Sequence, residues 1–225
     1  TSSVQLYGIV DVAYRHTNNE GAGKDGLTRM IDGGMSQSRW GINVEEDLGG
    51  GSKALVVLEN RLNADDGSVS TPFFQLSYLG LQGPYGRLTA GRQWNVLFDV
   101  VTSTYASFPY SPYMEAYKPE LGMAMGARTS NMLKYTFATP DRSFVGSLQY
   151  SFDENNDTKA LEAGLPASAA QVPAYVAGTL GGGAWKTAGG YLRYSANGFA
   201  VGGGYMRTTL PGGTDVDAWT LGGSY

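Results

Sequence analysis

The side chains that could do chemistry in this sequence are charged residues at alternate positions of otherwise apolar segments. Alternate residues of an extended chain point to opposite faces, so these charges share one face and the apolar side chains share the other. They are Asp11, Arg39, Lys53, Glu59, Arg61, Arg128 and Lys134. Filling a closed protein core with such charges would be costly, because each would leave water without a compensating partner. The pattern therefore favours strands whose polar face lies against water.

Nucleophiles and metal ligands are scarce. The chain has no cysteine, and His16 is its one histidine, with no serine in a recognisable nucleophile motif beside it. A catalytic triad needs partners in defined roles, and transition-metal sites are usually built from several Cys and His ligands. We expect no catalytic residue, no metal site and no cofactor. The net charge of -4 also argues against a nucleic-acid partner, which a basic face would normally bind.

The alternation of apolar and polar residues predicts strands along most of the chain. Ten segments alternate, and short turns follow every second segment while long loops follow the others. The segments are residues 4–14, 39–47, 53–61, 73–81, 87–93, 128–137, 143–153, 186–195, 199–207 and 218–225. Strands of about 9–11 residues span a bilayer when tilted, and short turns at one end with long loops at the other are typical of outer-membrane barrels. The sequence therefore predicts an all-β chain, a transmembrane antiparallel up-and-down β-barrel.

Aromatic residues support the membrane interpretation. They share the apolar faces near strand ends, where an interfacial girdle would lie. They are Tyr14, Trp40, Tyr78, Tyr150, Tyr205 and Trp219. A soluble β-sandwich that binds glycans stays an alternative, because each barrel segment alone gives a weak signal. A second alternative is a surface-exposed barrel whose external loops bind a partner.

Residues 94–127 interrupt the alternation between two strands. Loops of more than about 12–15 residues are usually functional or disordered, and the aromatic and Met content of this one argues against disorder. The sequence predicts an ordered insertion packed inside the space that the strands enclose.

Several stretches of the chain resemble the general porins of Gram-negative outer membranes, most closely the β-proteobacterial type. These stretches are SSVQLYGIVDVAY near the N-terminus, SRWGINVEEDLGGGSKALVVLE at residues 38–59, LGLQGPYGRLTAGRQ at 79–93, PELG at 119–122 and ARTSNMLKYT at 127–136. The resemblance implies a channel of sixteen strands for passive diffusion of ions and small hydrophilic solutes. It also implies a homotrimer set in outer-membrane lipid and lipopolysaccharide. Ten strands are fewer than such a barrel needs, so we expect this single domain of residues 1–225 to be incomplete.

The resemblance further implies a pore constriction in which residues 94–127 fold inward. By motif, Arg39, Arg92 and Arg128 would be wall arginines opposite loop acids. The acids would be Glu120 of PELG, with Glu115, Asp99 and the wall residue Glu59 as further candidates; Asp11, Lys53, Arg61 and Lys134 would face the lumen elsewhere. The balance of these charges leaves anion or cation preference open.

Arg92 is the exception to the alternation. Strict alternation groups it with Leu88 and Ala90, on the face expected to meet lipid. An arginine there would be costly at mid-membrane, so we expect a β-bulge near Gly91 to turn Arg92 inward.

Overall fold

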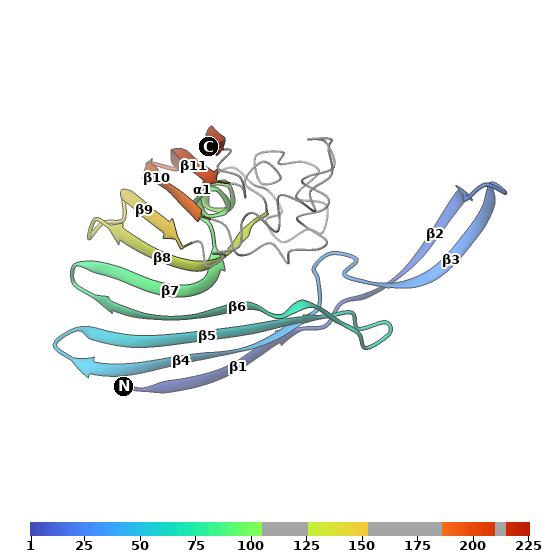
Figure 1. Cartoon of the computed structure of the whole chain (residues 1–225), viewed down its shortest axis with the longest axis horizontal. Helices are drawn as coiled ribbons and strands as arrows, with labels where there is room; N and C mark the ends of the chain where they lie inside the picture. Colours follow the sequence, from blue (N-terminus) through green and yellow to red (C-terminus); the bar gives the residue numbers. More distant parts are fainter. Residues whose placement is uncertain (105–125, 153–185, 210–214) are drawn as a thin grey trace, which may run out of the picture.

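The computed structural model describes residues 1–104, 126–152, 186–209 and 215–225, and most of them form one curved antiparallel sheet (Figure 1). Its ten strands follow the order β1-β4-β5-β6-β7-β8-β9-β10-β11-β12. The bounds are β1 Ser3–Ile9, β4 Arg39–Gly49, β5 Ser52–Leu62, β6 Val69–Gly83, β7 Gly86–Trp94, β8 Arg128–Ala138, β9 Phe144–Ser151, β10 Lys186–Ala196, β11 Phe199–Thr209 and β12 Asp215–Ser224. Nine of the ten predicted segments coincide with these strands, and the first, residues 4–14, does so only as far as Ile9. A single up-and-down sheet is not the two-sheet core of a sandwich, so that alternative is wrong.

Two kinds of connection alternate along the sheet. Short turns join β4 to β5, β6 to β7, β8 to β9 and β10 to β11, and Figure 1 shows these turns on one side. Longer connections join the other pairs at the opposite ends of the strands. We call the two ends the turn end and the loop end.

The first predicted strand, residues 4–14, is broken in the structure. β1 ends at Ile9, and β2 (Val12–Glu20) pairs with β3 (Asp25–Asp32) as a separate hairpin that projects from the sheet (Figure 1). The predicted loop at 15–37 is therefore largely strand. Asp11 lies at the break, where its Oδ2 accepts bonds of 2.8 Å from the amides of Met35 and Ser36. Alternation continues through the break, so the pattern could not reveal it.

One helix, α1 (Val96–Thr104), lies against the concave side of the sheet among the described residues (Figure 1). We call this side the inner face. Helix α1 contacts β9, β10, β11 and β12, and its buried core comprises Val96, Leu97, Phe98, Val101, Met206 and Ala218. No helix in the described part of the chain is long and apolar enough to cross a membrane.

Small residues on β11 make room for this helix. A Cβ atom at Gly202 would lie 3.0 Å from Val100 and Thr104, and one at Gly204 would lie 3.2 Å from Val100. Because Thr104 lies at Gly202 and Leu97 at Gly204, α1 runs along β11 from the loop end toward the turn end.

The outer face carries exposed apolar side chains. Among them are Val4, Leu6, Leu79, Leu81, Leu133, Leu148, Leu192, Val201, Trp219 and Leu221. A contiguous apolar face of this kind is typical of a surface that meets lipid. The sequence placed Tyr78 of β6 on the lipid-facing side, and this prediction is wrong. Leu79 and Leu81 are the exposed residues there, while Tyr78 lines a cavity beside α1. Both faces of β6 are apolar, and its register against β5 shifts near Asn60, so alternation did not determine which face is outer.

Candidate functional site

The start of α1 is fixed to the sheet by its capping residue. Asn95 Oδ1 accepts a 2.9 Å bond from the amide of Phe98, and Asn95 Nδ2 donates to the Gly126 carbonyl at 2.7 Å. The amide of Val96 donates to Gln149 Oε1 on β9 at 2.8 Å. An N-cap side chain satisfies amides that the first helical turn leaves without partners. The first turn therefore has a defined place on the inner face.

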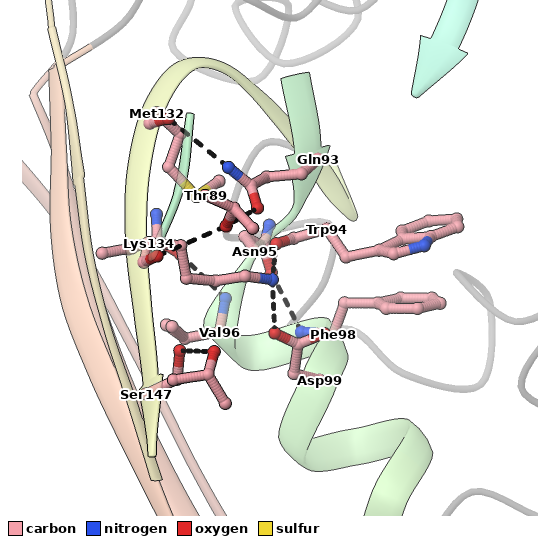
Figure 2. Close-up of polar contacts among 12 residues, drawn as sticks. Thr89, Gln93, Trp94, Asn95, Val96, Phe98, Asp99, Met132, Lys134 and Ser147 are labelled. Carbon is pink, nitrogen blue, oxygen red and sulfur yellow. Dashed lines mark hydrogen bonds and ion pairs between the residues drawn. The ribbon is translucent and has the colours of Figure 1, made fainter. Parts of the chain in front are cut away.

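Lys134 of β8 ties the same turn to the wall (Figure 2). Its Nζ donates to the Trp94 carbonyl oxygen and to Asp99 Oδ2, both at 2.7 Å. The side chains are 11% and 23% exposed, so this ion pair is largely shielded from water. Asp99, predicted as a constriction acid, is therefore engaged by a wall lysine in the structure.

Trp94 lies between the helix and the arginines. Its ring stacks on Phe98 with centroids 3.9 Å apart and an interplanar angle of 11°, and Figure 2 shows the two rings side by side. The guanidinium carbon of Arg128 lies 4.2 Å from the Trp94 centroid, and that of Arg61 lies 5.6 Å from it. A guanidinium over an indole is attracted by the ring quadrupole and keeps its in-plane N–H groups for other partners. Trp94 thus holds the positions of two cations.

Arg39, Arg61 and Glu59 are neighbours at the loop ends of β4 and β5. Each is buried, with exposed fractions of 7%, 7% and 5%. Arg61 Nε lies 3.4 Å from Glu59 Oε1, and Tyr7 donates its hydroxyl to Glu59 Oε2 at 3.0 Å. Arg39 Nη2 donates to Ser36 Oγ at 2.7 Å. Glu59 is thus held on the wall by two partners.

Arg92 lies beside a register shift between Gly91 and Gln93, where β7 pairs with β8. Gly91 has a φ of 128°, a value that L side chains rarely adopt. The predicted irregularity near Gly91 is therefore present. Arg92 Nη1 donates to Ser130 Oγ at 2.9 Å, two residues along β8 from Arg128.

Four arginines gather at this place. The charges of Arg39, Arg61 and Arg92, together with that of Glu59, all act on the Arg128 guanidinium. Four cations therefore face one carboxylate among the described residues, while Asp99 and Lys134 balance each other. Such a cluster sets up a positive local potential, which attracts anions and repels cations. The predicted acids Glu115 and Glu120, and most of the predicted inward loop at 94–127, lie outside the described residues.

Two other predicted lumen residues lie away from this cluster. Lys53 is at the turn end, where its Nζ pairs with Glu45 Oε2 at 2.9 Å in an exposed ion pair. Asp11 lies in the break between β1 and β2 rather than in a strand. Within the described ranges, no group of three or more His, Cys, Asp or Glu side chains could hold a metal ion.

Sequence reasoning missed Trp94 as a partner of the arginines. It treated this residue only as the start of an insertion. The available signal was its position directly after the GRQ motif, together with Phe98 one helical turn later.

Comparison with known proteins places this geometry in a family. The family model described as Gram-negative porin matches residues 1–225. Outer membrane porin protein 32 of Delftia acidovorans is 31% identical over 234 residues, covering 100% of this chain and 60% of the relative.

Solved structures share the fold. An anion-selective porin from Comamonas acidovorans has a TM-score of 0.74 at 29% identity, covering 100% of this chain and 64% of that one. A trimer form of OmpT from Vibrio cholerae has a TM-score of 0.62 at 18% identity, covering 100% of this chain and 61% of that one. The chain thus spans less than two thirds of the length of these relatives. With its up-and-down sheet and apolar outer face, this chain belongs to the Gram-negative porins, the family of its outer-membrane relatives.

Proposed function

We propose that the protein forms a water-filled channel of the outer membrane that favours small hydrophilic anions. The observation that carries this proposal is that Arg39, Arg61 and Arg92 lie close enough to Arg128 for their charges to act on it, with Glu59 as the one carboxylate among them. A ring of fixed cations at a narrow place selects by charge and radius, and low-dielectric walls strengthen its field. The anion-selective porin from Comamonas acidovorans, a similar structure at 29% identity, supports a preference for anions over cations.

The proposed narrow place is the inward loop at residues 94–127. Its described part supports this role, since α1 packs on the inner face and Phe98 of α1 stacks on Trp94, which lies against Arg128 and Arg61. If Glu115 and Glu120 both joined the constriction, four cations would still face three carboxylates with Glu59. The proposed preference for anions therefore does not depend on where these two acids lie.

The assembly we propose is a homotrimer in outer-membrane lipid and lipopolysaccharide. The exposed apolar outer face supports contact with lipid, and the family resemblance supports the trimer. Ions and small hydrophilic solutes would be its substrates, and no cofactor enters the proposal.

Liposome swelling tests this function with the full-length protein. Vesicles containing it would be diluted into isosmotic solutes of similar size that differ in charge. Examples are a gluconate salt as the anion, arabinose as the neutral solute and a lysine salt as the cation. We expect the anion to enter faster than the cation, because the arginines raise its local concentration. Vesicles that do not swell faster than protein-free ones would contradict channel formation, and faster entry of lysine would contradict the sign of the selectivity.

A further inference from the structure

A polar cavity lies on the inner face, and none of the four clustered arginines lines it, although Trp94 borders both. It has a volume of about 340 Å³ and is lined by residues of α1 and of the strands β6, β7, β8 and β10. Helix α1 contributes Asp99, Thr102 and Ser103, and the strands contribute Arg87 and hydroxyl side chains. Its size suits a hydrated inorganic anion or a small organic acid.

Arg87 gives the cavity its charge. The other charged lining residues, Lys134 and Asp99, pair at 2.7 Å and balance each other, so Arg87 leaves one net positive charge. Arg87 Nε is buried from solvent and has no hydrogen-bond partner among the described residues. Arg87 lines the cavity, and a guanidinium also carries four N–H groups on its two terminal nitrogens, which suit an oxyanion.

Further groups around the cavity suit an anion. Tyr78 and Tyr191 line it, and phenols donate hydrogen bonds to oxyanions. The charge of Arg87 acts on Tyr78, and the charges of Arg193 and Arg142 act on Tyr191. Arg87 is the one arginine that lines the cavity, and the one carboxylate in the lining, Asp99, is already paired with Lys134.

Arg87 lies at the part of the cavity that is farther from the loop end than the arginine cluster. Arg87 pairs with Gln82 and Thr136 close to the β6–β7 turn, whereas Trp94, beside Arg128, is the last residue of β7. Arg92 lies five positions along the strand from Arg87, a distance of roughly 17 Å at the usual rise. A solute moving from the loop end to the turn end would meet the arginine cluster first and Arg87 second.

We propose that this cavity is a second anion-binding site, which takes an oxyanion such as phosphate after it has passed the arginine cluster. The proposal rests on the proposed channel function but concerns Arg87, which is not one of the four clustered arginines, although Trp94, Asp99 and Lys134 line the cavity as well. Two weak sites in series let an anion leave the first without returning fully to water, and conduction requires binding that is favourable yet reversible.

The test is the conductance of single channels of the full-length protein in planar bilayers, measured against phosphate concentration. In Arg87→Gln, the phosphate concentration that gives half-maximal conductance should rise about five-fold, the size expected for one lost charge contact. Arg87→Lys keeps the charge but not the planar fork, so its value should fall between wild type and Arg87→Gln. Arg15→Gln removes the same charge from β2 and should match wild type.

The outcomes separate this proposal from the channel function. If Arg87→Gln and wild type saturate at the same phosphate concentration, the second site is overturned while the channel and its anion preference stand. If Arg87→Gln forms no channels, the Arg87→Lys channel decides: an unchanged half-maximal concentration overturns the site, and a raised one supports it. An absence of anion preference in wild type would instead contradict the proposed function itself.

Discussion

The inner face of the sheet is built in two ways. On β4, β5, β7 and β8 its loop end carries charges, among them Arg61 and Arg128. On β11 and β12 it carries Gly202, Gly204, Met206 and Ala218, which pack against α1. The first half holds largely buried charged side chains beside Trp94, and the second half is covered by α1. The difference shows that the inner face is apolar where α1 packs on it and charged where its side chains contact one another and Trp94.

The largest expected effect comes from breaking the pair that joins the two halves. Lys134→Met would leave the Asp99 carboxylate shielded from water without its cation. We expect a loss of about 2–4 kcal/mol in the free energy of unfolding, somewhat below the cost for a fully buried pair. Urea unfolding of the detergent-refolded protein measures it.

Lys53→Met is the matched control, because it breaks an exposed ion pair at the turn end. Its effect should stay within about 0.5 kcal/mol. Adding Asp99→Leu to Lys134→Met should recover part of the loss. Equal losses for Lys134→Met and Lys53→Met would show that the pair does not hold α1.

The next effect concerns the covered half. Gly204→Val would place methyl groups where a Cβ already lies 3.2 Å from Val100 and 3.3 Å from Leu97. Overpacking of this kind costs about 1–3 kcal/mol, and it should also increase current fluctuations by loosening α1. Gly203→Val, one residue along β11 on the outer face, is the control and should cost clearly less. A Gly204→Val protein as stable as Gly203→Val would mean that α1 does not dock on β11.

A smaller effect is expected at the junction of helix and charges. Trp94→Leu removes the stack on Phe98 and the cation–π contact with Arg128. The loss of stability should be about 1–2 kcal/mol, and the anion preference should weaken as Arg128 gains freedom. Trp40→Leu, on the outer face, should leave the zero-current potential unchanged. Selectivity that shifts equally in both variants would contradict a positioning role for Trp94.

The smallest effect lies outside both halves, at the base of the β2–β3 hairpin. The amides of Ser36 and Met35 donate to Asp11 and hold the pKa of this exposed carboxyl below its ordinary value. A lowered pKa stabilises the fold at pH values above the unfolded-state pKa, and this contribution is lost as pH falls through the folded-state value. Hydrogen exchange at Met35 and Ser36 should therefore lose protection on acidification below the ordinary carboxyl range. Asp11→Asn should show no such pH dependence, and an identical pH profile in both proteins would refute the role of Asp11.

Much of the fold was predictable because alternation is a direct consequence of strand geometry. The ten strands and most outer faces follow from it, and the chain's polar inner residues mark where water is expected. The sequence did not predict the hairpin β2–β3, because residues 4–14 alternate without interruption although β1 ends before Asp11 and β2 begins after it. The sequence did not predict helix α1 either, because no local pattern marks it. Six of its nine residues are buried, so it has no polar face that would mark a helical period in the sequence.

The sequence predicted which residue types form the candidate site, but not which residues pair with one another. Motifs placed Arg39, Arg92 and Arg128 together, yet the pairing of Asp99 with Lys134 depends on where α1 begins relative to β8. The contact of Trp94 with two arginines likewise joins residues on three strands. Such partnerships are set by packing between distant segments, and no local pattern carries them.

The most direct test of the charged half is the zero-current potential of the full-length channel across a tenfold KCl gradient. The four arginines predict that chloride is the more permeant ion in wild type. They also predict that Arg128→Gln combined with Arg61→Gln moves the potential toward zero, while Arg15→Gln leaves it unchanged. A wild-type potential of the sign that potassium permeation gives would contradict the account.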